Sequence, residues 1–241
     1  ALEVVRKESE RLYRLAQGVI AHGIGWRKRD IIGTEDLDSL TRKPPLPPTE
    51  NIDEVYATRI KSIHSAILEF IIKAGTHVDG IYGEQLQLYS AAGRDLVNAI
   101  KGVKHLQKNL QQFIRSNNPS IRDAYNHQRK LIAMVMRKIH EVGEIDDPTE
   151  IALILDHTLL KIEEDSRDTA KRIEALIRDR NISAEMATSL MTDTEYTNNI
   201  CLMLISMAKV LFGKKEASAL KFEHDLELSD EEMGSIIQQE K

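Results

Sequence analysis

Apolar residues recur along most of this chain at spacings that alternate between three and four positions. Such spacing lines up apolar side chains along one face of an α-helix, and that face is then buried against a neighbouring element. The clearest series predicts a helix over about 83–115 with one buried face. Its members are Ala92, Leu96, Ala99, Val103, Leu106, Leu110 and Phe113.

Five further series bring the expected number of long helices to six, the first of them over about 2–29. Polar residues interrupt three of the series, at Gln128, at Ser166 and Thr169, and at Thr194 and Thr197. The apolar members are Val5, Leu12, Leu15, Val19 and Ile20; Tyr56, Ile60, Ile63, Ile67, Phe70 and Ala74; Ile121, Tyr125, Ile132, Val135, Ile139 and Val142; Leu155, Leu159, Ile162, Ile173 and Leu176; Ala187, Leu190, Cys201, Leu204, Ala208 and Leu211.

Helix-capping residues lie where the later series begin and end. Asn118 and Asp147 each precede a proline, which is well suited to the first position of a helix because its missing N–H needs no partner there. Ser183 suits the start of the last long helix and Gly213 its end. These signals place the boundaries of the fourth, fifth and sixth helices.

One segment, about 32–51, is expected to be irregular. It contains four prolines within Lys43–Pro48, a density that no α-helix accommodates. A connection this long is uncommon in a compact bundle, so we expect it to cross between helix ends or to dock on the surface. A proline-rich ligand for another domain is the alternative interpretation.

The helices fall into two sets of three because short turns join the second to the third and the fifth to the sixth. The sequence therefore predicts an all-α fold of two antiparallel three-helix bundles side by side. The first would occupy 1–116 and include the proline-rich connector 33–50, and the second would occupy 117–214. An acidic tail, 215–241, is expected to contain a short helix over about 230–239.

Composition excludes several classes of protein. Aromatic residues make up only 5%, which argues against a β-sandwich or barrel, and the net charge of −5 argues against nucleic acid as a partner. A single cysteine, Cys201, forms no internal disulfide, as expected in a reducing compartment. The longest apolar stretch, 200–212, contains Lys209 and is too short to span a bilayer. Since Ala1 already belongs to a helical pattern, we expect a soluble fragment of a longer protein.

No catalytic motif is found. Di-metal carboxylate bundles need Glu-x-x-His on two helices, and no histidine here has a glutamate three positions before it. Zinc-ligand pairs, phosphate-binding glycine loops and nucleophile motifs are also missing from the sequence. We therefore predict that the chain is not an enzyme and needs no cofactor. The histidines are His22, His64, His77, His105, His127, His140, His157 and His224.

Four basic side chains form a stripe on the third helix. Lys101, Lys104, His105 and Lys108 stand at i, i+3, i+4 and i+7, so they share one face beside the apolar series. One interpretation is a solvated helix surface. The other is a site for an anion or for an acidic partner.

Two carboxylates on the fifth helix stand one turn apart. Glu164 and Asp168 could hold a metal ion if another helix supplied further ligands. Arg167 and Lys171 lie close by in the sequence, and they favour the alternative of a solvated surface with ion pairs.

Three stretches resemble the PhoU-like region that follows the membrane domain in bacterial sodium/phosphate cotransporters. They are Arg11–Ile20, the segment from Asp193 to Phe212, and the most specific one, Ala-Ile-Lys-Gly-Val-Lys-His-Leu-Gln-Lys-Asn-Leu over Ala99–Leu110. The resemblance extends over about 1–213. It implies two three-helix bundles at the cytoplasmic face of the bacterial inner membrane.

The resemblance also implies a function. The chain would regulate a sodium-dependent phosphate transporter through contacts with the membrane domain of the same protein, with self-association as a further option. Phosphate would be involved only indirectly. Metal-binding PhoU proteins carry Glu/Asp-x-x-x-Asp motifs in both bundles, whereas this sequence offers only Glu164 with Asp168.

Two other functions stay open at this stage. One is a free-standing PhoU-like regulator of phosphate uptake and signalling, and the more distant one is a metal-binding bundle enzyme. Apolar spans of about 20 residues upstream of Ala1 would identify a transporter, and bound metal in the purified protein would identify the metalloenzyme.

Overall fold

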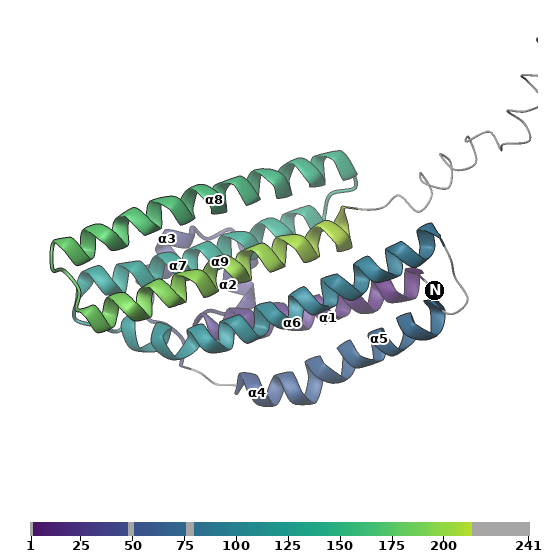
Figure 1. The fold of residues 1–241 in the computed structure, drawn as a ribbon, viewed down its shortest axis with the longest axis horizontal. Coiled ribbons are helices and arrows are strands. Elements are labelled where there is room, and N and C mark those ends of the chain that lie inside the picture. The colour runs from purple at the N-terminus through teal and green to yellow at the C-terminus, as the bar shows by residue number, and fades with distance from the viewer. Residues whose placement is uncertain (1, 48–50, 76–79, 214–241) are drawn as a thin grey trace, which may run out of the picture.

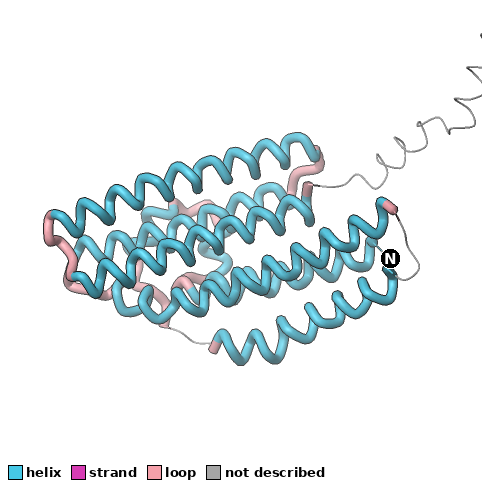
Figure 2. The backbone as a smooth tube through the Cα atoms, viewed as in Figure 1, coloured by secondary structure: helices cyan, strands magenta, loops and turns pink. Residues whose placement is uncertain are grey.

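A computed structural model describes residues 2–47, 51–75 and 80–213 of the chain, and every regular element in these ranges is a helix (Figure 2). The expected all-α class is therefore confirmed for the described chain. The acidic tail 215–241, with its expected helix at 230–239, lies outside the described residues.

Six helices of 15 or more residues run roughly along the long axis of the molecule (Figure 1). Four shorter elements connect the first long helix to the second. The long helices are α1 (Leu2–Gly23), α5 (Lys61–Gly75), α6 (Ile81–Phe113), α7 (Pro119–Gly143), α8 (Pro148–Arg178) and α9 (Ala184–Phe212). The short elements are α2 (Lys28–Ile32), α3 (Leu37–Arg42), α4 (Ile52–Val55) and one π-helical turn, η1 (Tyr56–Ile60).

The predicted capping residues start the later helices. The Asn118 side chain accepts the backbone N–H groups of Ser120 and Ile121, and Asp147 accepts that of Thr149. Ser183 accepts the N–H of Met186. Each bond satisfies a donor that the first turn of a helix leaves without a partner.

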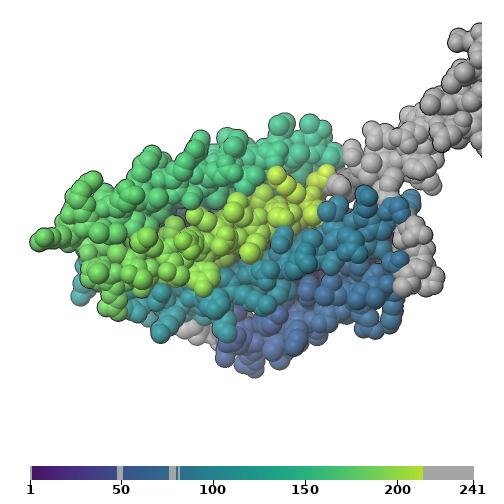
Figure 3. All heavy atoms as spheres, in the orientation of Figure 1, coloured from purple at the N-terminus to yellow at the C-terminus, as the bar shows by residue number. Residues whose placement is uncertain are grey.

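Helices α6 and α9 lie at the centre of the molecule and make the most extensive contact between any two described elements. Helices α1 and α5 pack against α6, and α7 and α8 pack against α9. The space-filling view shows α9 between α8 and α6, with α5 on the other side of α6 (Figure 3). Close approach of the central pair depends on Gly102, because a Cβ there would lie 2.8 Å from Cγ1 of Ile200.

The apolar series of α6 is buried at all seven predicted positions. The series predicted for α5 is wrong at Phe70, which is 38% exposed, whereas Ile71 is buried in its place. Ile60 and Ile67, at the end of the π-helical turn η1 and after it, are buried as predicted, so the departure lies in the last turns of α5, where the buried residue is four positions after Ile67 and not three.

The first helix is shorter than predicted. It ends at Gly23, and the chain turns through Gly25, whose φ of 78° is a conformation that favours glycine. Arg129 of α7 fixes this turn: its Nε donates to the carbonyl of Ile24 at 2.7 Å, and its guanidinium lies 4.3 Å from the centre of the Trp26 ring. The turn therefore forms through a contact distant in sequence.

The segment expected to be irregular contains α3 and the end of α2. Two hydrogen bonds from Arg137 of α7 hold this part of the chain. Its Nε donates to the carbonyl of Ile31 at 2.7 Å, and its Nη2 donates to the carbonyl of Glu35 at 2.8 Å. The proline-rich stretch then docks on the surface, which is one of the two predicted arrangements. The N–H of Leu46 donates a hydrogen bond to the carbonyl of Gly25. Its last residue, Pro48, lies outside the described ranges.

Candidate functional site

The four basic residues predicted on the third helix do lie together on α6. Lys101, Lys104, His105 and Lys108 are all exposed and follow one another along the helix beside the buried series. We call this surface the cationic face.

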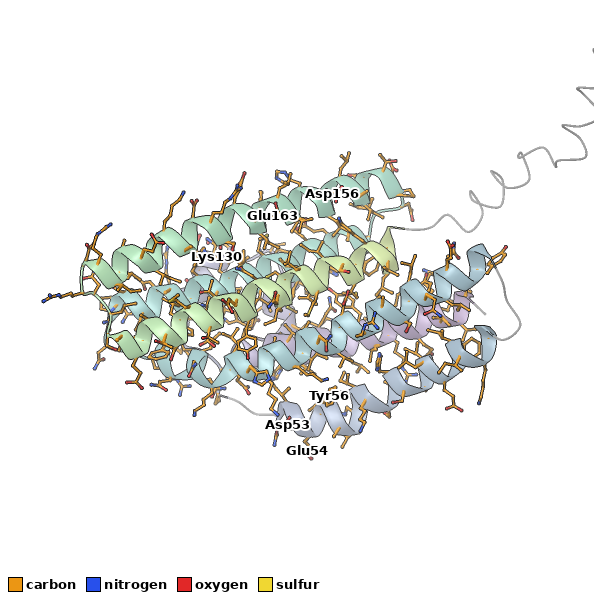
Figure 4. The ribbon with its side chains drawn as sticks, viewed as in Figure 1. Asp53, Glu54, Tyr56, Lys130, Asp156 and Glu163 are labelled. Atoms are coloured by element: carbon orange, nitrogen blue, oxygen red, sulfur yellow. The ribbon has the colours of Figure 1, made fainter. Side chains whose placement is uncertain are left out.

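The α4–η1 segment lies against the first part of the cationic face (Figure 4). Lys104 Nζ is 2.6 Å from a carboxylate oxygen of Asp53, and Lys101 Nζ is 6.0 Å from the centre of the Tyr56 ring. Both contacts are exposed to solvent and contribute little to stability. They orient the two lysines without burying them.

The second part of the cationic face reaches α9. The His105 ring stacks on Tyr196, with ring centres 5.2 Å apart and planes inclined by 11°. Lys108 has no ion pair with any described residue. Lys101, whose contact is with an uncharged ring, has no ion pair there either, so the face presents two lysines whose charges are not neutralised by a described carboxylate.

His64 of α5 lies next to the cationic face. Burial and the nearby charge of Lys101 lower the pKa of this histidine, so its imidazole is neutral at pH 7. Its buried Nε2 has no hydrogen-bond partner among the described residues. A neutral ring at this position keeps further positive charge away from Lys101.

The predicted metal pair is on the outer surface of α8. Glu164 and Asp168 are both exposed, and Asp168 forms an ion pair with Lys171 at 3.3 Å. Within 2–47, 51–75 and 80–213, no three or more histidine, cysteine, aspartate or glutamate side chains are grouped so as to bind a metal ion. Among the described residues, the structure brings no third ligand to this pair.

A buried carboxyl group joins α6, α7 and α9. Asp193 is 2% exposed and accepts hydrogen bonds from Tyr125 Oη at 2.6 Å and from Asn109 Nδ2 at 2.9 Å. Burial raises the pKa of Asp193, and burial together with this carboxyl group raises the pKa of Tyr125. These residues form a structural link between three helices.

A groove of about 610 Å³ lies between α7 and α8, with α3 at one edge. A hydrogen bond of 2.7 Å between His127 Nε2 and Asp165 Oδ1 bridges the two helices beside it. Lys130 is on the α7 side and pairs with Asp38 of α3 at 2.6 Å. Polar lining comes from Ser120, Asp123, Asn126, His127, Gln128, Lys130, Thr169 and Arg172, and apolar lining from Ala124, Ile173, Leu176 and Leu190.

The sequence did not predict this groove. Its polar residues come from three segments far apart in the chain, and none of them forms a motif. One signal was present: Gln128, which interrupts the apolar series of α7, is 2% exposed and lines the groove.

Comparison with protein-family models, curated proteins and solved structures gives no match. No helix in the described part of the chain is both long and apolar enough to cross a lipid bilayer. The assignment of a function therefore rests on the residues and their geometry.

Proposed function

We propose that this chain is a PhoU-like regulatory domain of a sodium-dependent phosphate transporter. It would lie at the cytoplasmic face of the bacterial inner membrane and contact the membrane domain of the same protein. Regulation would act through contacts between protein surfaces, without a catalytic step by this domain.

The contacts among the six long helices are the observation that supports the proposal most. Helices α1, α5 and α6 contact one another, α7, α8 and α9 contact one another, and α6 with α9 joins the two sets. That pattern supports two three-helix bundles, at 1–116 and 117–214, which share the extensive contact of α6 with α9. It accords with the PhoU-like resemblance of Ala99–Leu110, which lies on the central helix α6.

The cationic face is the surface we propose for the partner. Lys108 has no local counter-ion among the described residues, and the ion pair of Lys104 is exposed, so an acidic surface can compete for both. A partner that binds one conformation of the transporter more tightly shifts the equilibrium toward that conformation. Phosphate need not touch the domain for this to work.

Sodium-driven phosphate uptake by the full-length protein in proteoliposomes tests the proposal. We expect deletion of residues 1–213 to change the uptake rate. Double charge reversal, Lys104→Glu with Lys108→Glu, should change it in the same direction and leave the helical content and unfolding temperature unaltered, because both side chains are exposed.

A matched control makes the same change in charge on another exposed surface, with Lys161→Glu and Lys171→Glu on α8. This variant should transport as the unaltered protein does. Uptake that is insensitive to the deletion would refute the regulatory function, and equal effects of the two double variants would refute the role of the cationic face.

A further inference from the structure

The acidic tail carries the charge opposite to that of the cationic face. Residues 223–240 contain no lysine or arginine. They contain instead a run of carboxylates that stand one to three positions apart: Glu223, Asp225, Glu227, Asp230, Glu231 and Glu232. A segment with this density of negative charge is attracted to a cationic surface, and the same chain offers one.

Positive charge continues along α6 beyond both ends of the cationic face. Arg94 stands seven positions before Lys101, and Arg115 stands seven positions after Lys108, just past the end of α6. Residues seven apart on a helix share nearly the same face and are separated by about 10.5 Å along the axis. Both arginines are exposed and form no ion pair with a described residue. With the cationic face they form a line of positive charge about 30 Å long.

Helix α9 carries the chain to a point close to this line. Tyr196 of α9 stacks on His105 of α6. Further along α9, Ile200 faces Gly102, which comes earlier on α6, so the two helices run side by side in opposite directions (Figure 1). The last described residue, Gly213, comes just after α9 and therefore lies about 20 Å along the axis from the level of Gly102. The tail thus starts beside α6, beyond the Arg94 side of the cationic face.

The chain after Gly213 is long enough to return to the cationic face. Residues 214–222 can span up to about 30 Å, which exceeds the distance of about 20 Å back to the level of Lys101. Glu223 is therefore within reach of Lys101. The next step along the face, from Lys101 to Lys108, is about 10.5 Å, and the seven residues from Glu223 to Asp230 cover it in any conformation from helical to extended. The spacing of the carboxylates thus matches the spacing of the unpaired lysines.

Attachment to the same chain favours the tail over an unattached acidic peptide. A single exposed ion pair is weak and is screened by salt. Several such pairs made by one segment act together, and a short tether keeps the carboxylates at an effective concentration near millimolar around the face. A contact of this kind forms at low ionic strength and is released by salt or by a stronger acidic partner.

From these observations we propose that segment 223–240 of the acidic tail docks on the cationic face, with Glu223 near Lys101 and Asp230 near Lys108. The docked tail covers the surface that the proposed function assigns to the membrane domain, so the tail and the membrane domain compete for it. This competition rests on the proposed function, whereas the contact between the tail and the face does not.

The distance between two nitroxide labels on the purified 241-residue chain, measured by double electron–electron resonance, tests the contact. The labels are attached through Gln112→Cys on α6 and Ser235→Cys in the tail, which change no charge, and the buried Cys201 stays unlabelled. At about 10 mM salt, where the screening length is about 30 Å, we expect a narrow distribution near roughly 20 Å, as between two packed segments. At about 1 M salt the tail should be released, and the distribution should broaden and move to about 40 Å.

Charge reversal on the face locates the contact. Lys101→Glu with Lys108→Glu should give the long, broad distribution at low salt as well, and the unfolding temperature should not change because both side chains are exposed. The matched control, Lys161→Glu with Lys171→Glu on α8, changes the charge equally and should keep the short distance. A long distance in the unaltered chain at low salt would overturn the contact. So would a short distance that both double variants change equally, or that neither changes.

The competition is tested separately, in the full-length protein. Asp230→Asn with Glu231→Gln and Glu232→Gln removes the densest charge of the tail. Sodium-driven uptake should then change in the direction opposite to that caused by Lys104→Glu with Lys108→Glu, because the membrane domain gains access to the face. Unaltered uptake in this variant, together with a changed rate after deletion of 1–213, would overturn the competition and not the regulatory function.

Discussion

Buried polar side chains are distributed unevenly between the two sets of helices. Around α1, α5 and α6 they are few, and one of them, Ser9, has no hydrogen-bond partner for its Oγ among the described residues. Around α7, α8 and α9 they are more numerous. Asp193 accepts from Tyr125 of α7 and Asn109 of α6, and Arg129 donates to the carbonyl groups of the turn after α1. The first group is Ser9, Gln17 and Gln85, and the second is Gln128, Arg129, Thr158, Asp193 and Thr197.

This difference has a physical consequence. An apolar interface is stabilised in rough proportion to its buried area and tolerates many side chains of suitable size. A polar interface fixes the position of each helix, because any shift leaves a buried donor or acceptor without its partner. We therefore expect α7–α9 to be the more sensitive part of the molecule, and three substitutions test this expectation in order of effect.

The largest loss should follow Arg129→Leu. Arg129 is 1% exposed, and its loss leaves the carbonyl group of Ile24 without its donor, takes one of two donors from that of Gly25, and removes the contact with Trp26. Burial lowers the pKa of the guanidinium to about 10, so it stays charged at pH 7. We expect a loss of about 3–5 kcal/mol in the free energy of unfolding measured with urea.

Arg122→Leu is the control, because it makes the same arginine-to-leucine change on the same helix. Its side chain is 42% exposed and its ion pair with Asp123 is 3.9 Å long, so the loss should stay below about 1 kcal/mol. Similar losses in the two variants would show that the buried guanidinium of Arg129 contributes no more to the free energy of unfolding than the exposed one of Arg122.

An intermediate loss should follow Gly102→Ala at the contact between the two sets of helices. The new Cβ would meet Ile200 at 2.8 Å and force α6 and α9 apart, at a cost of about 1–3 kcal/mol. Gly18→Ala on α1 adds the same methyl group where nothing lies within 4 Å, and should stabilise the chain by about 0.5–1 kcal/mol. If both variants had a higher free energy of unfolding in the same urea titration, tight packing between α6 and α9 at Gly102 would be contradicted.

The smallest effect should come from Asp193→Asn, and it should depend on pH. Burial raises the pKa of Asp193, so its contribution to stability is complete below the pKa of an unfolded aspartate and is lost as pH rises through the folded pKa. Asparagine keeps an acceptor for Tyr125 and Asn109 and does not ionise. We expect about 1 kcal/mol of stabilisation at pH 7–8 that declines as pH falls toward 4.

Thermal unfolding between pH 4 and 8 measures this difference, and Asp168→Asn is its exposed counterpart on α8. That variant should change the unfolding temperature little at any pH, because its carboxylate is solvated. A destabilised Asp193→Asn protein at pH 8 would mean that the ionised carboxylate is the form the fold prefers.

Local periodicity explains what the sequence predicted well. The apolar series of α6 needs only the 3.6-residue repeat and a neighbour to bury it, and every predicted member is buried. The short helices α2 and α3 have no such series; they depend on Arg137, about 100 residues later in the chain. No local pattern reports a contact of that kind.

The same distinction applies to the candidate sites. Lys101, Lys104, His105 and Lys108 lie on one helix, so their spacing alone placed them on one face. Their partners Asp53 and Tyr196 come from other helices, and so do the walls of the α7–α8 groove. Polar interruptions of an apolar series are the one local sign of such places, since they require partners once buried.

The central position of α9 also constrains the order in which the chain can fold. Helix α6 ends at Phe113 and its main partner begins at Ala184, so a ribosome finishes α6 well before α9 exists. Synthesis at about 5–20 residues per second leaves the apolar face of α6 without that partner for several seconds. During that interval the nascent chain is open to chaperones, to a second nascent copy, and to aggregation.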